Sequence, residues 1–153
     1  MPIQGKDNFN YNFIHNKGLG KLYFDFSEKE IFKLLGKPSK IEVDIDIPRI
    51  EETKRFFYYN EGIMISISMY DGNPELIKIF PQKILLNGVN LFDLRKKKFL
   101  TFIKDFHISN KIEFFFEESN LYEEIQIFYF NIGLTVWFLD EKVSDICIEM
   151  PDL

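Results

Sequence analysis

Residues that could carry catalysis are few in this chain, and their spacing forms no recognisable site. His15 stands near a predicted turn and His107 follows a predicted helix, and neither has a partner suited to acid–base catalysis. We therefore expect both histidines to be ordinary surface or loop residues. Cys147 lies in an apolar strand pattern without a basic neighbour that would lower its pKa, so we expect a core or sheet-face residue and not a nucleophile. Gly-rich phosphate loops, His-x-x-x-His pairs and Gly-x-Ser-x-Gly motifs are absent, and the sequence therefore predicts no enzymatic activity, no metal and no cofactor.

Acidic residues, in contrast, gather in two segments. The first places Glu42, Asp44 and Asp46 on one face of a predicted strand and continues into Glu51 and Glu52. Alternate strand residues stand too far apart to chelate Ca²⁺ easily, and no Asp-x-Asp-x-Asp-Gly loop is present. Two interpretations remain open: a solvated sheet face, or a docking surface for a basic protein, whose encounter long-range attraction would speed. The second acidic segment lies at the equivalent place in the other half of the chain. The acidic candidates for partner binding are Asp44, Asp46, Glu51 and Glu52 in the first segment and Glu117, Glu118, Glu123 and Glu124 in the second.

Aromatic residues provide the other candidates. They make up 17% of the chain, and residues 114–116 and 128–130 are aromatic runs in predicted strands. Neighbours in a strand point to opposite faces, so these runs cannot all enter a core that lies on one side of a sheet. We therefore expect part of the second face to be aromatic and exposed, or covered by a dimer partner or a loop. Phe115 and Trp137 are the aromatic candidates for partner binding.

Composition and charge narrow the class of protein. A chain of 153 residues with 46% apolar residues is long enough for one core, and we expect a single domain over residues 1–153. Its net charge of −5 does not suit general binding to nucleic acid. A single cysteine rules out an internal disulfide. The sequence lacks a signal-peptide pattern and a run of about 20 apolar residues, so we expect a cytoplasmic protein that is not in a membrane.

Periodicity places these residues on predicted elements. Residues 27–38 form the best-specified helix, with a Ser/Glu capping box at the start and a Gly-x-Pro stop at the end. A second helix is predicted over residues 95–106. Alternation predicts strands over residues 9–13, 22–26, 41–47, 56–59, 63–69, 76–80, 112–117, 125–130, 134–139 and 143–150, with residues 49–54 as a loop and a hairpin around Asn87-Gly88.

An internal repeat organises these elements. Residues 20–35 match residues 88–103 without a gap, and the Tyr-Asn-x-Gly turn near residue 60 matches the Phe-Asn-x-Gly turn near residue 131. The second helix keeps the apolar face but loses the capping residues. The sequence therefore predicts an α+β fold of two tandem similar units, about 9–81 and 82–153. Each would have a hairpin, one short helix and about three antiparallel strands, with the helices on one face of a curved sheet of roughly eight strands.

A resemblance to known families follows from the first helix. Its pattern Ser-x-x-Glu-Ile-x-x-Leu-Leu-Gly-Lys-Pro, leading into an antiparallel meander, resembles the SmpA/OmlA lipoprotein domain and the beta-lactamase-inhibitor-protein fold. Those families are exported, whereas this chain has neither a lipid-acceptor cysteine near its start nor paired cysteines. The chain also looks like the small acidic immunity proteins encoded beside bacterial polymorphic toxins. This resemblance implies a non-catalytic inhibitor that binds a basic toxin or enzyme; a self-associating module and a small-ligand-binding protein are the alternatives.

Overall fold

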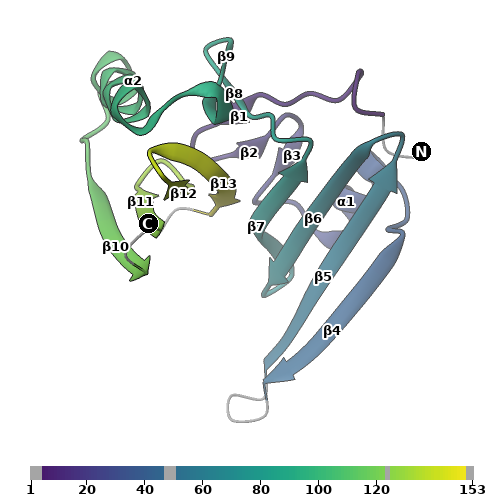
Figure 1. Cartoon of the computed structure of the whole chain (residues 1–153). Coiled ribbons are helices and arrows are strands. Elements are labelled where there is room, and N and C mark those ends of the chain that lie inside the picture. Colours follow the sequence, from purple (N-terminus) through teal and green to yellow (C-terminus); the bar gives the residue numbers. More distant parts are fainter. Residues whose placement is uncertain (1–4, 47–50, 123–124, 151–153) are drawn as a thin grey trace.

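The central element of the structure is an eight-stranded sheet in which every neighbouring pair is antiparallel. The computed structural model describes residues 5–46, 51–122 and 125–150 (Figure 1). In these described ranges two α-helices accompany the sheet, which is the α+β arrangement that the sequence predicts. The strands, in spatial order, are β10 (Phe116–Tyr122), β11 (Ile125–Phe130), β12 (Leu134–Leu139), β13 (Lys142–Glu149), β7 (Asn73–Phe80), β6 (Ile63–Tyr70), β5 (Glu51–Asn60) and β4 (Lys40–Asp46).

Helix α1 (Glu28–Leu35) has the ends that its sequence predicts. The Glu30 N–H donates to Ser27 Oγ at 3.3 Å, and the Ser27 N–H donates to Glu30 Oε1 at 3.2 Å. These two bonds form a capping box, which satisfies backbone donors that the first turn leaves free. Gly36 ends the helix at a φ of 85°, a conformation that residues with a Cβ rarely adopt.

Helix α2 (Lys96–Ser109) begins without a side-chain cap at Arg95 and follows a short 3₁₀ turn, η1 (Leu91–Asp93). Burial stabilises it instead: Phe99, Ile103 and Phe106 are buried in the core. The helix extends past residue 106, where its predicted range ends. In the part of the chain that the structure describes, neither helix has the length and apolarity that crossing a membrane requires.

Both helices pack on the same face of the sheet, which we call the core face. The ring of Phe32 on α1 lies 5.3 Å from that of Phe56 on β5, and the ring of Phe99 on α2 lies 5.4 Å from that of Phe138 on β12. Strand register confirms that this is one face, because a single row of apolar residues crosses all eight strands. The row runs through Ile41, Phe56, Ile67, Ile77, Ile148, Leu134, Phe130 and Phe116.

Small hairpins complete the core. Strands β1 (Phe13–Ile14), β2 (Gly18–Leu19) and β3 (Leu22–Tyr23) form one small sheet, and β8 (Leu85–Leu86) and β9 (Val89–Asn90) form another. The Leu85 N–H on β8 donates to the carbonyl of Tyr11, which precedes β1, at 2.9 Å, and this bond joins the two small sheets. Strand β2 contacts β13, and Leu19 and Leu22 are buried in the main core. These hairpins therefore seal the core face near the middle of the sheet.

Several predicted elements differ from the observed ones. The strand expected over residues 9–13 is reduced to β1, and the expected loop over residues 49–54 is partly strand, because β5 begins at Glu51. The strand expected over residues 112–117 begins only at Phe116. Its earlier backbone groups bond instead to the side chain of Asn131, which accepts from the Phe115 N–H at 3.4 Å and donates to the Glu113 carbonyl at 2.9 Å.

Strand β4 also differs from expectation in its burial. Its alternation predicts an apolar face in the core, yet the exposed fractions of Ile41 and Val43 are 51% and 50%. Ile41 and Val43 stay exposed because β4 is the edge strand and extends, with β5, beyond the part of the sheet that α1 covers (Figure 1).

Candidate functional site

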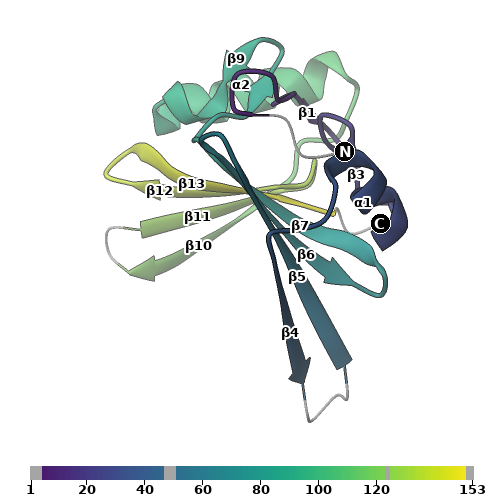
Figure 2. The same cartoon turned by 90° about the vertical axis from the view of Figure 1, so that its right-hand side faces the viewer.

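The face of the sheet opposite α1 and α2 is the candidate site, and we call it the open face (Figure 2). Strand register places Glu117, Tyr129, Thr135, Trp137 and Lys78 on this face. Part of it is aromatic and exposed, as the aromatic runs in the sequence predict. Within the described part of the chain, the exposed aromatic side chains on this face include Tyr59, Tyr70, Phe80 and Tyr129.

The two four-stranded halves of the sheet meet at β7 and β13. These strands pair through Ile77–Ile148 and Leu76–Glu149. Side chains continue the junction on the open face: Lys78 Nζ lies 3.0 Å from Asp145 Oδ2 and 5.4 Å from the centre of the Trp137 ring. The open face is therefore one continuous surface made of segments that are far apart in sequence.

Cys147 is buried at this junction. Burial raises the pKa of its thiol to about 12, although the nearby ammonium of Lys78 acts in the opposite direction. The sequence showed no basic neighbour because Lys78 comes from the other half of the chain. At neutral pH the thiol stays protonated, and Cys147 is a buried sheet residue on the open-face side of β13.

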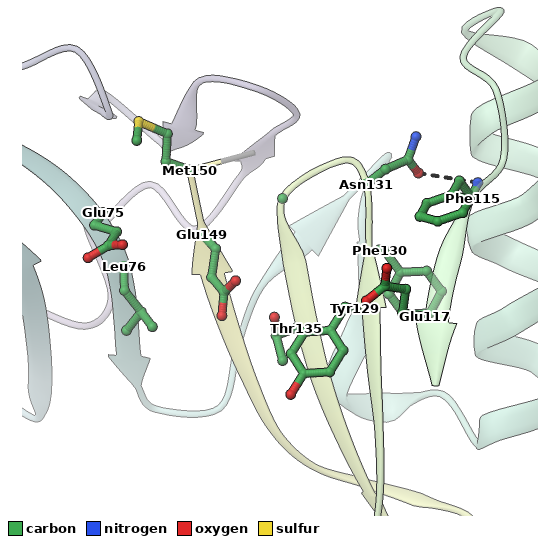
Figure 3. A pocket seen from close by; sticks show the side chains of 11 residues that line it. Glu75, Leu76, Phe115, Glu117, Tyr129, Phe130, Asn131, Thr135, Glu149 and Met150 are labelled. Carbon is green, nitrogen blue, oxygen red and sulfur yellow. Dashed lines mark hydrogen bonds between the residues drawn. The ribbon is translucent and has the colours of Figure 1, made fainter. Parts of the chain in front are cut away.

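A cavity of about 620 Å³ opens on the open face beside the junction (Figure 3). Its volume is within the range of about 300–1,000 Å³ that is usual for ligand sites. Three carboxylates line it, and within the described part of the chain the lining contains no Lys, Arg or His, and none of the three forms an ion pair. We call this cavity the acidic pocket; its lining includes Glu75, Glu117, Glu149, Tyr129, Thr135 and Phe115.

Strand register fixes how these side chains lie. Glu117, Tyr129 and Thr135 stand directly opposite one another on β10, β11 and β12. Thr135 also stands opposite Cys147 on β13, so Glu149 is its diagonal neighbour. Neighbouring strands lie about 4.8 Å apart. Thr135 on β12 therefore lies between the carboxylates of Glu117 on β10 and Glu149 on β13, which stand on strands that are not neighbours. Consistent with this spread, no group of three His, Cys, Asp or Glu residues in the described part could hold a metal ion.

Thr135 is the most buried polar group of the acidic pocket. Its exposed fraction is 2%, and its hydroxyl has no hydrogen-bond partner among the described residues. Every fully enclosed side-chain nitrogen or oxygen in that part of the chain does have a partner. The hydroxyl therefore keeps access to the pocket, where Figure 3 shows Thr135 between Tyr129 and Glu149.

One wall of the acidic pocket is held by a buried histidine. His107 on α2 is buried, with Nδ1 2.8 Å from the Ile103 carbonyl and Nε2 2.9 Å from Asn131 Oδ1. Asn131 bonds in turn to the backbone of Phe115 and Glu113, which precede β10. The expectation that His107 is a surface or loop residue is therefore wrong, because the helix continues past it and directs its ring into the core.

The structure separates the candidate residues predicted from the sequence. Glu117 and Phe115 line the acidic pocket, and Trp137 lies on the open face outside it. Glu118 points to the core-face side, where it accepts a hydrogen bond from Gln126 Nε2 at 3.3 Å. Asp44 is paired with the guanidinium of Arg55 at 2.7 Å.

The other predicted residues are outside what the structure describes. The backbones of Asp46, Glu51 and Glu52 pair in β4 and β5, but their side chains lie outside the described part. Glu123 and Glu124 lie outside the described residues altogether.

Sequence reasoning missed the residues that complete the acidic pocket: Glu75, Glu149, Tyr129 and Thr135. The alternation around Trp137 does place Thr135 on the same face, so one signal was present. The pairing of β13 with β7, which brings Glu149 to Glu75 and Leu76, has no local signal. No protein-family model, no curated protein and no solved structure matches this chain.

Proposed function

We propose that this chain is a non-catalytic protein-binding inhibitor, an immunity protein that neutralises a cognate bacterial toxin by covering its functional site. The observation that carries this proposal is the acidic pocket, whose carboxylates lie unpaired on a sheet face without helices. Unpaired carboxylates at a surface favour a basic partner, because complementary potentials speed encounter and disfavour other partners. In this proposal the protein acts in the cytoplasm and binds a protein, not nucleic acid.

The character of the rest of the open face supports the same function. Tyr59, Phe80 and Tyr129 are exposed there, and aromatic side chains are enriched at the centres of protein interfaces. The net charge of −5 adds a long-range attraction for a basic protein.

We further propose that the chain consists of two similar units, residues 9–81 and 82–153, that arose by duplication. The match between residues 20–35 and 88–103 supports this proposal. The strand order supports it as well, since α1 precedes β4–β7, α2 precedes β10–β13, and the last strand of each half lies at the centre of the sheet. Such a duplication resembles the beta-lactamase-inhibitor-protein fold and would double the area of the binding face.

The decisive experiment is co-expression with the toxin-like product of a neighbouring gene. The wild-type chain is expected to restore growth to cells that make this toxin and to form a complex with it in gel filtration. A variant with Glu75→Gln, Glu117→Gln and Glu149→Gln is expected to lose most of the rescue, because its pocket no longer carries charge. Failure of the wild-type chain to rescue growth or to bind any neighbouring product would refute the proposal.

A matched control separates the pocket from net charge. The changes Asp93→Asn, Asp105→Asn and Asp140→Asn remove the same number of charges at exposed positions outside the acidic pocket. This variant is expected to rescue growth as well as the wild-type chain. Equal loss of rescue in both variants would show that overall acidity, and not the pocket, is responsible.

Self-association is the second candidate function, and the edge strand β4 favours it. Ile41 and Val43 on this strand are half exposed on its apolar face. An exposed apolar edge strand is a template for pairing with another chain. Sedimentation over a wide range of concentration tests this candidate, and a monomer at every concentration would exclude it.

A further inference from the structure

We propose that the acidic pocket receives the guanidinium of a single arginine side chain from the partner protein. This inference rests on the proposed function and names the group that the open face recognises. The groups that carry it are the buried hydroxyl of Thr135, the carboxylates of Glu117 and Glu149, and the ring of Tyr129.

Charge sets the sign of the ligand. The acidic pocket has carboxylates and no basic side chain in the described part of its lining, and none of these carboxylates forms an ion pair there. A cationic group that enters would gain charge-assisted hydrogen bonds, which are about twice as strong as neutral ones.

Thr135 shows that the interior of the pocket can accept hydrogen bonds. Its hydroxyl belongs to a side chain that is 2% exposed, and it has no partner among the described residues. Asn131 also lines the pocket, but its amide is engaged by His107, Phe115 and Glu113. The free polar groups are therefore carboxylates and hydroxyls, all of which can accept a hydrogen bond, and a ligand that carries several donors would satisfy them.

Spacing distinguishes a guanidinium from a metal ion or an ammonium. Glu117 and Glu149 lie on opposite sides of Thr135 in the strand register, and in the described part of the chain no group of three His, Cys, Asp or Glu residues could hold a metal ion. A guanidinium presents five donors in a planar fork and stacks on aromatic rings, whereas an ammonium is a compact, strongly hydrated point charge. The partly exposed ring of Tyr129, which stands between Glu117 and Thr135, offers such a stacking surface.

The cavity size and position indicate that the arginine is part of a protein. A cavity of about 620 Å³ exceeds the volume of one side chain, and its mouth is continuous with the open face. An arginine on a protruding loop would place its backbone at the mouth of the pocket while flanking residues lie along the sheet.

The test is an NMR titration of the full chain with the capped tripeptide Ac-Gly-Arg-Gly-NH₂. Shifts are expected at the amides of Tyr129, Thr135 and Glu149. The citrulline analogue, which has the same shape without the charge, is expected to bind at least about tenfold more weakly. Spermidine is the second probe, because a free polyamine has a related charge without a guanidinium.

Adjacent residues on β10 supply the matched control. Glu117→Gln removes a carboxylate from the acidic pocket, whereas Glu118→Gln removes one from the other face of the same strand. Glu117→Gln is expected to weaken peptide binding about tenfold and Glu118→Gln to leave it unchanged. Thr135→Val is expected to weaken it several-fold by removing the buried acceptor. If Thr135→Val does not fold, the comparison of Glu117→Gln with Glu118→Gln still tests whether the peptide binds in the acidic pocket.

Three results would overturn the inference: no shifts at the pocket, equal binding of the citrulline peptide, or tighter binding of spermidine than of the arginine peptide. Its failure is distinct from that of the proposed function. A chain that rescues growth without binding the peptide disproves only the arginine site, and a chain that binds the peptide without rescuing growth disproves only the immunity function.

Discussion

His107 Nε2 lies 2.9 Å from Asn131 Oδ1, and this contact joins helix α2 to the wall of the acidic pocket. Both ring nitrogens of His107 face oxygen atoms, since Nδ1 lies 2.8 Å from the Ile103 carbonyl. The contact matters for the site because Asn131 also fixes the backbone of Phe115, which lines the pocket.

Replacing this histidine tests the connection. His107→Leu is expected to lower the free energy of unfolding by about 1–3 kcal/mol, because the buried side chain loses its polar contacts with the Ile103 carbonyl and with Asn131 Oδ1. Urea denaturation measures this change, and the Phe115 amide is expected to shift in NMR spectra. His15→Leu is the control, since His15 is half-buried and contacts the ring of Phe106; it is expected to cost less than about 1 kcal/mol. Equal costs for the two variants would contradict a special role for His107.

Tyr58 links β5 to the end of α1, because its hydroxyl donates to the Gly36 carbonyl at 2.9 Å. Tyr58→Phe is expected to lower the free energy of unfolding by about 0.5–1.5 kcal/mol at neutral pH. Tyr70→Phe, at an exposed tyrosine, is the control and is expected to change stability by less than about 0.5 kcal/mol.

The contribution of Tyr58 to the free energy of unfolding is also expected to depend on pH in the alkaline range. Burial raises the pKa of Tyr58 from 10.0 to about 12, so the folded state favours the neutral phenol. The resulting stabilisation is complete below pH 10 and is lost as the pH rises toward 12. The difference in stability between the wild-type chain and Tyr58→Phe is therefore expected to shrink over this range. A constant difference from pH 8 to pH 12 would be evidence against the raised pKa.

Cys147 is expected to be inert in the folded protein. Burial raises the pKa of its thiol from 9.0 to about 12, and the thiolate is the reactive form. Labelling with Ellman's reagent at pH 8 is expected to be roughly a thousandfold slower in the native state than in urea. The urea-unfolded chain is the internal control. Rapid native labelling would show that the junction between β7 and β13 opens readily.

Two isoleucines in one row of the sheet test the exposure of the β4 edge. Ile41 and Ile67 share the apolar row on the core face, but their exposed fractions are 51% and 0%. Ile67→Val is expected to lower the free energy of unfolding by about 0.5–1.5 kcal/mol, as is typical of a buried site. Ile41→Val is expected to change it by less than about 0.5 kcal/mol. If the two variants cost the same in urea denaturation, another surface covers β4 in solution.

The sequence determines the local elements because their signals are local. Ser27, Glu30 and Gly36 specify the ends of α1 within a few residues of each other, and the structure has both caps. Alternation along β6 predicts which residues are buried there, since the two faces of a central strand differ in environment. The class of fold and the aromatic character of the open face also follow from such patterns.

Tertiary structure alone decides what depends on segments far apart in the chain. The Asn131 side chain binds the backbone before β10, so this strand begins later than its pattern predicts. His107 is buried because α2 continues past it. Ile41 is exposed because β4 is the edge strand of the sheet. The acidic pocket has the same origin, because the pairing of β13 with β7 brings Glu149 beside Leu76. Pattern and propensity describe neighbours in sequence, whereas these contacts depend on which strands meet in the middle of the sheet.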